Sequence, residues 1–289
     1  MLRILVLLFC FYVLMPPSFA QGEIPNDSRL RAVADRKVVR IAYRRDATPF
    51  SFVRDTERGT PVGYTIDLCR LVVDGIGRQL GQTLKIEWVS VTVNTRFSAI
   101  MDDQADMECG SSTVTLRRFE EVDFSSFVFV ESTAILVRRQ SDIRSLSDMN
   151  GKRIAVIAGT SNERAVADRI RHLKLNAATL VAVQSRAEGI AAVESGAADG
   201  YASDRLLLVG AAKQRPAELA LLPDELSVEP YAIALPRGDW AFRLAVNRAL
   251  AHIYGSGAQY DVFVRWFEQI GLHPSDALSM AWTLGILAD

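Results

Sequence analysis

The chain has 289 residues, of which 49% are hydrophobic and 23% charged, and its formal net charge is −1. This length allows two domains of ordinary size, and the composition is typical of a globular protein. The near-neutral charge and the absence of a polybasic tract argue against nucleic acid as a partner. The three histidines are scattered along the sequence, so we expect neither a metal site nor a cofactor.

The first twenty residues have the pattern of a secretory signal peptide. Arg3 precedes an apolar run over 4–15, two prolines break that run, and Ser18 and Ala20 occupy the small-residue positions of a cleavage site. The run is too short for a permanent transmembrane helix. Cys10 lies inside it, without the context of a lipoprotein cleavage site. We therefore expect a signal peptide over 1–20 and export to the periplasm.

The other two cysteines, Cys69 and Cys109, fall on an expected helix and an expected strand of the same lobe. An exported protein meets an oxidising compartment, which permits a disulfide without requiring one. The sequence leaves both the bridged and the free state open.

Strands and helices alternate through the first half of the chain. Apolar residues at helical spacing predict a long helix that opens at Gly63. The expected helices cover 28–35, 63–80 and 95–101, and the expected strands cover 37–43 and 84–89. A loop rich in aromatic residues, including Phe50 and Phe52, separates the first strand from the long helix.

The alternation resumes after an extended segment and a polar, turn-rich stretch. These two segments cover 127–137 and 142–150, and they are followed by strands over 152–158, 180–184 and 198–202 and helices over 163–173, 186–195 and 205–212. A further extended segment over 228–235 leads to amphipathic helices over 239–254 and 256–267 and to a tail expected to be irregular or weakly helical. Two such runs imply two three-layer α/β lobes with largely parallel sheets.

The segment around Gly110 combines a short buried strand with small polar side chains and a nearby cation. Gly110 lets the backbone approach another group closely. The three hydroxyl residues over 111–113 offer side-chain oxygens and free backbone amides. Arg118 follows on a helical turn, and its planar fork suits a carboxylate. The alternative is a solvated loop in which Arg118 pairs with Glu121 or Asp123.

Distinctive polar groups follow three other expected strands as well. Arg44 follows the first strand, Thr160 and Ser161 follow the first strand of the second run, and Asp204 ends a later one. Ligands of open α/β sheets bind outside the carboxyl ends of strands, so two facing lobes would gather these groups in one cleft. Singly, each has a plain structural explanation: a solvated charge run for Arg44 and helix caps for Thr160 and Asp204.

The motif Asp106-Met107-Glu108-Cys109-Gly110-Ser111, with Thr113 and Arg118 beyond it, resembles the signature of bacterial extracellular solute-binding proteins of family 3. These are the polar amino acid receptors of ABC importers, and this form of the motif resembles their glutamate/aspartate-binding branch. The similarity runs from about 38 to 267. It implies a two-lobed α/β periplasmic binding protein fold of type II, with crossovers over 129–135 and 229–235. The lobes would comprise 21–131 plus 233–289, and 132–232.

The resemblance also implies roles for individual residues. Arg118, with Ser111 and Thr113, would hold the α-carboxylate of an amino acid, and Asp204 would bind its ammonium group. Phe50 and Phe52 would either wall the site or belong to the core.

Further groups would complete the site. The helix N-terminus at Thr160 and Ser161 would add backbone amides from the second lobe. Arg44 and Arg96 match positions that hold a side-chain carboxylate. Arg186 stands where receptors of this branch usually have a histidine, so it would add a fourth cation or point to solvent.

A charge count favours an acidic ligand. Three arginines and one aspartate give a site charge of 3 − 1 = +2. A neutral amino acid would leave two of these arginines without a carboxylate, and removing one partner of a buried ion pair costs about 3–5 kcal/mol. We therefore expect the ligand to be glutamate or aspartate.

The expected protein is a monomeric periplasmic receptor that closes on its ligand and docks on the membrane permease of an ABC transporter. One alternative is a cyclohexadienyl dehydratase-like enzyme on the same fold, with Glu108, Glu163 or Asp204 as a general acid. We expect no enzymatic activity, because the sequence has no nucleophile–base pair and no metal motif. A sensor domain that acts through a partner is a third hypothesis.

Overall fold

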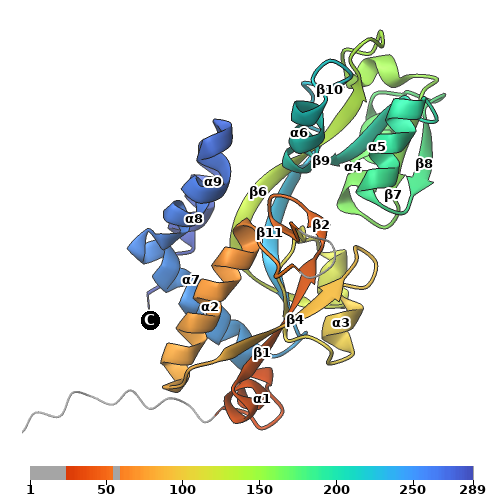
Figure 1. Ribbon diagram of the computed structural model, residues 1–289. Helices are drawn as coiled ribbons and strands as arrows, with labels where there is room; N and C mark the ends of the chain where they lie inside the picture. The colour runs from red at the N-terminus through yellow and green to blue at the C-terminus, as the bar shows by residue number, and fades with distance from the viewer. Residues whose placement is uncertain (1–23, 55–58, 289) are drawn as a thin grey trace, which may run out of the picture.

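The computed structural model describes residues 24–54 and 59–288. As expected, they form two α/β lobes joined by two long strands (Figure 1). The signal peptide predicted over 1–20 lies outside the described residues. None of the helices in the described part of the chain has the length and apolar character that a membrane crossing requires.

One nine-stranded sheet runs through both lobes in the order β4-β1-β5-β11-β6-β9-β7-β8, with β10 paired to β6. Its strands are β1 (Val38–Arg44), β4 (Lys85–Val91), β5 (Met107–Glu108), β6 (Asp123–Arg138), β7 (Arg153–Ile157), β8 (Thr179–Val183), β9 (Gly200–Asp204), β10 (Leu219–Leu221) and β11 (Val228–Leu235). β1 is parallel to β4 and β5, and β7 is parallel to β8 and β9. β6 and β11 are antiparallel to their neighbours. Each lobe therefore combines a parallel set of strands with the two antiparallel crossovers.

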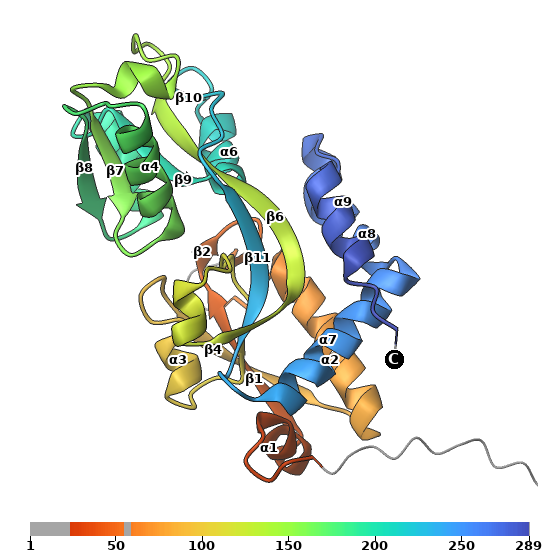
Figure 2. The ribbon, with the colours of Figure 1, turned by 180° about the vertical axis from the view of Figure 1, so that it is seen from behind.

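The crossover strands β6 and β11 pair with each other and place Glu229 opposite Glu131. Figure 2 shows both strands continuing from one lobe into the other. The lobe boundaries predicted at 131/132 and 232/233 fall inside these strands. β6 begins at Asp123, earlier than the predicted extended segment over 127–137, because Phe124 already pairs with Ala234 of β11.

The helices agree with the expected ones to within a few residues. Lobe one carries α1 (Arg29–Arg36), α2 (Tyr64–Leu80), α3 (Ser98–Met101), α7 (Trp240–Ser256), α8 (Ala258–Phe267) and α9 (Asp276–Leu284). Lobe two carries α4 (Ser161–His172), α5 (Arg186–Ser195) and α6 (Arg205–Gln214). Short 3-10 turns are η1 (Arg117–Glu120), η2 (Leu146–Met149) and η3 (Glu268–Ile270). The helix that was predicted to carry Arg96 begins only at Ser98, so Arg96 lies in the preceding turn.

The C-terminal tail is more regular than expected. The hydroxyl of Ser275 caps α9 by accepting a hydrogen bond from the backbone N–H of Leu278. Leu278 and Trp282 are buried in the lobe-one core, so the helix is held by packing that its short sequence does not signal. The small hairpin of β2 (Asp46–Ala47) and β3 (Ser51–Phe52) was also not predicted, because two-residue strands show no periodicity.

The disulfide that the sequence left open is formed. Cys69 of α2 is bonded to Cys109, which directly follows β5, and their Cα atoms are 6.5 Å apart. Both residues lie in the lobe-one core. The bridge therefore anchors to α2 the turn that leads from β5 through Gly110 to the hydroxyl residues.

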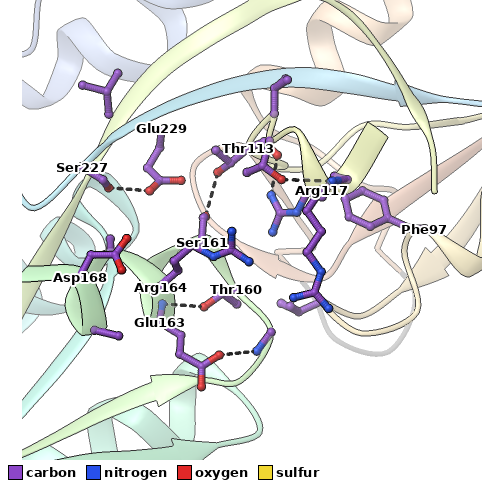
Figure 3. A pocket seen from close by; sticks show the side chains of 18 of the residues that line it. Phe97, Thr113, Arg117, Thr160, Ser161, Glu163, Arg164, Asp168, Ser227 and Glu229 are labelled. Carbon is purple, nitrogen blue, oxygen red and sulfur yellow. Dashed lines mark hydrogen bonds between the residues drawn. The ribbon is translucent and has the colours of Figure 1, made fainter. Parts of the chain in front are cut away.

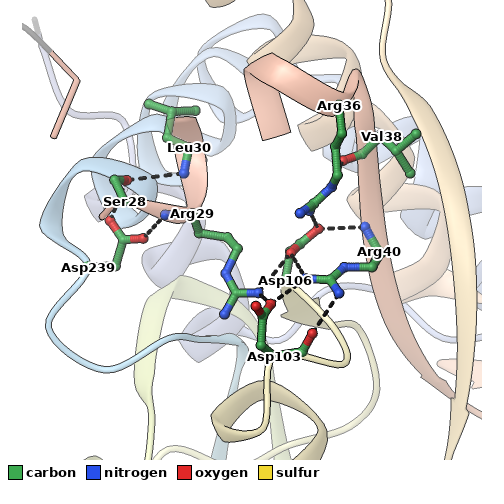
Figure 4. Close-up of polar contacts among 9 residues, drawn as sticks. All are labelled: Ser28, Arg29, Leu30, Arg36, Val38, Arg40, Asp103, Asp106 and Asp239. Atoms are coloured by element: carbon green, nitrogen blue, oxygen red, sulfur yellow. Dashed lines mark hydrogen bonds and ion pairs between the residues drawn. The ribbon is translucent and has the colours of Figure 1, made fainter. Parts of the chain in front are cut away.

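A cluster of ion pairs holds the far end of the same lobe together (Figure 4). Asp106 is fully buried, and its carboxylate pairs with Arg29, Arg36 and Arg40 and accepts the backbone N–H of Arg40 at 2.7 Å. These contacts connect α1 and β1 to the start of β5. The buried carboxylate thus joins three arginines through charge-assisted hydrogen bonds.

Candidate functional site

A cavity of about 980 Å³ lies between the lobes and is lined by residues of both (Figure 3). Lobe one contributes the turn before α3 and the segment from Thr113 to Arg118. Lobe two contributes one side of α4, from the turn before its N-cap as far as Arg171, and Leu180 of β8. The third wall comes from the start of the crossover strand β11, at Ser227, Val228 and Glu229. A ligand in a cavity between two lobes can be contacted by both lobes at once.

Arg96 is a buried cation on the lobe-one wall. The residue is only 6% exposed. Its Nε donates a hydrogen bond to the Ser112 hydroxyl at 2.9 Å, and a second guanidinium nitrogen donates to the backbone carbonyl of Val93. The guanidinium lies over the ring of Phe97, with its Cζ atom 4.3 Å from the ring centroid. These contacts fix the direction of the fork without neutralising its charge.

Arg118 is the second buried cation and shares the same aromatic ring. Its Cζ atom is 5.4 Å from the Phe97 centroid, and one nitrogen donates to the carbonyl oxygen of Thr113. The alternative in which Arg118 pairs with Glu121 or Asp123 is wrong: Asp123 pairs with Arg243, and no ion pair joins Arg118 to Glu121. Arg118 is therefore held by neutral groups.

Neither Arg96 nor Arg118 forms an ion pair with any carboxylate of residues 24–54 and 59–288. Burial, together with repulsion from Arg118, lowers the pKa of Arg96 to about 9. Burial also lowers the pKa of Arg118, against the opposing effect of Glu229 and Asp204. Both shifts have the same main cause, the removal of a cation from water without an anion in contact. An anionic ligand would supply that missing partner.

Lobe two faces the two arginines with a helix N-terminus. Thr160 is the N-cap of α4, and its hydroxyl accepts the backbone N–H of Glu163. The next residue, Ser161, donates its hydroxyl across the cleft to the hydroxyl of Thr113 at 3.2 Å. The positive end of the helix dipole and free amides thus add to the positive potential of this part of the cavity.

Two carboxylates lie at the crossover end of the site. Glu229, on β11, lines the cavity, and its Oε1 accepts from the hydroxyls of Thr133 and Ser227. Asp204 lies behind the wall, where its Oδ1 accepts from the Asn162 side chain at 2.8 Å. Burial raises the pKa of Asp204, and that hydrogen bond opposes the rise. Asp204 begins α6 without capping it through its side chain, so the proposed helix-cap role is not what the structure shows.

Arg44 and Arg186 converge on Asp46 and not on the cavity. Nε and a terminal nitrogen of Arg44 contact the Asp46 carboxylate at 2.9 and 2.7 Å. Arg186, from α5 in lobe two, donates to the backbone carbonyl of the same residue. Arg186 therefore bridges the lobes. Arg44 belongs to a local charge pair, as one alternative supposed, although it is buried and not solvated.

The aromatic pair of the first loop also lies away from the cavity. Phe50 is fully buried in a cluster with Tyr64, Phe129 and Tyr231. Phe52 packs edge-on against Trp266 of α8. Of their two possible places, the structure puts Phe50 in the core and Phe52 at the edge of that core.

Gly110 lies in close contact with two neighbouring side chains. A Cβ atom there would meet Oε1 of Glu108 at 2.1 Å and Cγ of Arg44 at 3.2 Å. Glu108 is fully buried beneath the site, does not line the cavity, and has its pKa raised by burial. Ser111 is half-exposed outside the cavity lining, whereas its neighbour Ser112 contacts Arg96.

The structure thus brings Arg96, Thr113, Arg118, Thr160 and Ser161 together around one cavity. It places the remaining predicted residues outside the lining: Arg44, Phe50, Phe52, Ser111, Arg186 and Asp204. Sequence reasoning missed Phe97 and Glu229. A glutamate at the start of an otherwise apolar strand was the one signal that could have indicated Glu229.

Two α/β lobes joined by crossover strands, with a charged cleft between them, are the defining features of periplasmic-type binding proteins. Residues 39–269 match the family model of bacterial extracellular solute-binding proteins, family 3, and the chain belongs to that family. An L-glutamate/L-aspartate-binding protein of Pseudomonas aeruginosa is 30% identical over 83% of this chain and 80% of its own length.

Solved structures agree on the fold and differ in their ligands. An ancestral arginine-binding protein bound to glutamine has a TM-score of 0.70 and 26% identity, over 80% of this chain and 98% of that one. An ancestral amino acid-binding protein described as a precursor of cyclohexadienyl dehydratase has a TM-score of 0.71 and 27% identity, over 83% and 99% of the two chains. The chain is therefore a solute-binding protein of the amino acid ABC transporter family.

Proposed function

We propose that this protein is the periplasmic receptor of an ABC importer for glutamate or aspartate. Two buried guanidiniums without an ion-paired carboxylate, Arg96 and Arg118, support this proposal most directly. A dicarboxylic amino acid brings one carboxylate for each arginine, whereas a neutral amino acid leaves one of them unpaired at a cost of several kcal/mol. The similarity to the Pseudomonas aeruginosa protein points to the same ligands.

In the proposed complex, Arg118 and Thr113 bind the α-carboxylate, and the amides at Thr160 and Ser161 approach it from lobe two. Arg96 binds the side-chain carboxylate. Asp204 balances the ligand ammonium from behind the cavity wall. Because these groups come from both lobes, a ligand that contacts all of them favours the closed arrangement over an open one.

The remaining predicted residues take supporting places in this proposal. Arg44 and Arg186 both contact Asp46, so they steady the cleft entrance and add long-range positive potential without contacting the ligand. Ser111, Phe50 and Phe52 shape the lobe-one loops behind the site. The bound receptor, acting as a monomer, would deliver its ligand to a membrane permease.

The test is calorimetry of the mature protein with L-glutamate, L-aspartate, L-glutamine and L-arginine. We expect the two acids to bind most tightly. In Arg96→Ala the preference for glutamate over glutamine should shrink by roughly tenfold or more, since one charge-assisted contact is lost. Tighter binding of glutamine or arginine by the wild-type protein would refute the acidic specificity.

The enzymatic alternative is addressed by the same preparation. Of its general-acid candidates, Glu163 lines the cavity but is half-exposed and bonds the backbone N–H of Gly159, and Glu108 and Asp204 do not line it. Incubation of the protein with prephenate or arogenate should yield no product. Glutamate incubated with the protein should be recovered unchanged. Turnover of either compound would replace the receptor proposal with a dehydratase.

A further inference from the structure

Glu229 has one carboxylate oxygen that is satisfied and one that is not. Oε1 accepts from Thr133 at 3.1 Å and from Ser227. Oε2 is buried and has no hydrogen-bond partner among the described residues, and the whole residue is 2% exposed. Buried polar atoms are nearly always hydrogen-bonded, because an unpaired one loses its hydrogen bonds to water and gains none within the protein. This oxygen is therefore an acceptor in need of a donor.

The position of Glu229 indicates where that donor would come from. The residue lines the inter-lobe cavity at the start of β11, and in Figure 3 its carboxylate reaches from Ser227 toward the side of Thr113 and Ser161. Among the charged groups around Arg118, Glu229 has the largest effect on the pKa of that arginine, yet the two form no ion pair. A molecule seated between Arg118 and Glu229 would face a positive and a negative group at once.

Asp204 is placed differently. It lies outside the cavity lining, and Asn162 occupies its Oδ1. The same Asn162 amide nitrogen also donates to Thr133, whose hydroxyl bonds Glu229. Asp204 and Glu229 are thus the two ends of one hydrogen-bonded chain; both are buried, and of the two only Glu229 lines the cavity.

We propose that Glu229 is a ligand-binding residue that receives the cationic nitrogen of the bound amino acid on its free Oε2. This inference rests on the proposed function and refines it: Arg96 and Arg118 select for anionic groups, and Glu229 selects for an ammonium group at a set distance from them. Simple dicarboxylic acids, which lack that nitrogen, place a carboxylate near Glu229 without a donor to offset the repulsion.

Because Glu229 lies on a crossover strand, this contact also couples the ligand to the hinge. Its cross-strand partner is Glu131 on β6, and Thr133 of the same strand bonds its other oxygen. A ligand nitrogen on Oε2 would fix the β6–β11 pair at the place where the lobes rotate. The ammonium group then contributes to closure as well as to affinity.

The test compares two ligands in two proteins. L-Glutamate and glutarate differ chiefly in the amino group, and Glu229→Gln keeps an oxygen for Thr133 and Ser227 while removing the charge. We expect the variant to bind L-glutamate roughly 10- to 100-fold more weakly, the usual effect of losing a charged hydrogen bond. Glutarate, measured by displacement of glutamate, should bind the variant at least as well as it binds the wild type.

Glu131→Gln is the matched control. It removes a carboxyl group from the facing position of the other crossover, and Glu131 does not line the cavity. Its affinity for L-glutamate should stay within about threefold of the wild type. Melting curves of both unliganded variants report whether each one is folded.

Every other outcome contradicts either the role inferred for Glu229 or the proposed receptor function on which that role rests. Equal losses for glutamate and glutarate in Glu229→Gln would assign Glu229 a structural role, and no loss would exclude it from the site. If the wild type prefers another amino acid, the acidic specificity fails, and the same comparison with that amino acid and its deaminated form still tests Glu229. If no amino acid binds, both proposals fail.

Discussion

Two groups of arginines in lobe one meet opposite conditions. At one end, Arg29, Arg36 and Arg40 surround the carboxylate of Asp106 (Figure 4). At the cavity, Arg96 and Arg118 share one aromatic ring, each donates to its own backbone carbonyl, and neither has an ion pair within the described residues. The first group holds the fold together. The second keeps its charge for a partner that the chain does not supply, so the missing carboxylate distinguishes a binding site from a structural ion pair.

The contact of Arg44 and Arg186 with Asp46 is an intermediate case. The contact joins the two lobes, as a site would, but the Asp46 carboxylate already pairs with Arg44, and Arg186 donates only to the Asp46 backbone carbonyl. The count of three free cations therefore does not hold: Arg44 has a carboxylate within 2.7 Å. The acidic specificity now depends on Arg96 and Arg118 alone.

The largest effect should come from breaking the paired cluster. Asp106→Asn leaves three arginines around a neutral amide, and we expect the free energy of unfolding to fall by about 3–5 kcal/mol. Urea denaturation measures this, and calorimetry on the folded variant should give wild-type affinity for glutamate. An unchanged denaturation midpoint would show that the cluster contributes nothing to stability.

Removing an arginine of the unpaired group should have the opposite effect, weakening ligand binding and leaving stability intact. Arg118→Ala removes the carboxylate-binding fork, and glutamate affinity should fall by roughly 100-fold or more, about 3 kcal/mol. Stability should hold or rise, because a buried cation without an anion is removed. The neighbouring Arg117→Ala, at an exposed position on the rim, should cost less than about threefold. Undiminished glutamate binding by Arg118→Ala would refute the site.

Glu131 is the acidic counterpart of the unpaired arginines, because it is a buried carboxyl group that forms no ion pair within the described residues. Burial raises the pKa of Glu131 to about 8, a net value in which the hydrogen bond from the Ser132 backbone N–H opposes the rise and the charge of Asp204 adds to it. The folded protein therefore keeps a proton that the unfolded chain releases near the ordinary value of 4.5. Its contribution to stability is complete below that value and is lost as the pH rises through the folded pKa.

We accordingly expect the stability advantage of Glu131→Gln over the wild type to grow with pH. Between pH 6 and 7.5 the difference in unfolding free energy should increase by about 2 kcal/mol, at 1.4 kcal/mol for each pH unit. Urea denaturation at a series of pH values measures it, and the carboxyl of Glu108 cancels because both proteins contain it. Parallel pH profiles would contradict the assignment.

The smallest effect should come from an exposed pair on the cavity rim. Asp168 and Arg171 of α4 pair three residues apart, with side chains 55% and 77% exposed. Asp168→Asn should change stability and glutamate affinity by less than about 0.5 kcal/mol, because water screens such pairs. A larger change in affinity would mean that the rim takes part in binding.

The secondary structure was accessible to sequence reasoning wherever a local signal existed. α5 occupies the predicted span, and the crossover β11 matches its predicted segment, because periodicity and capping act over a few residues. α9 was underestimated, since its stability comes from Leu278 and Trp282 packing on distant core residues. The β2–β3 hairpin was too short to leave a pattern.

The candidate site was only partly accessible. Thr113 and Arg118 could be recognised from the spacing around Gly110, and both line the cavity. Phe50 could not be separated from the core, because an aromatic residue looks the same in a wall and in a cluster. Glu229 lies far along the chain from Arg118 and gains its meaning only when β11 is paired with β6.

Residue order alone was enough to indicate two α/β runs, two extended segments and an arginine-bearing turn after a glycine, because each depends on neighbours within one or two turns of chain. That the extended segments cross between lobes was implied only by the family resemblance. Which cations would be neutralised depended on folding. Asp106 meets Arg29 across 77 positions and Arg36 across 70, and no spacing rule reports such a meeting. Electrostatic partnership is a matter of distance in space, so only the folded chain could show that Arg96 and Arg118 lack an anion and that one oxygen of Glu229 lacks a donor.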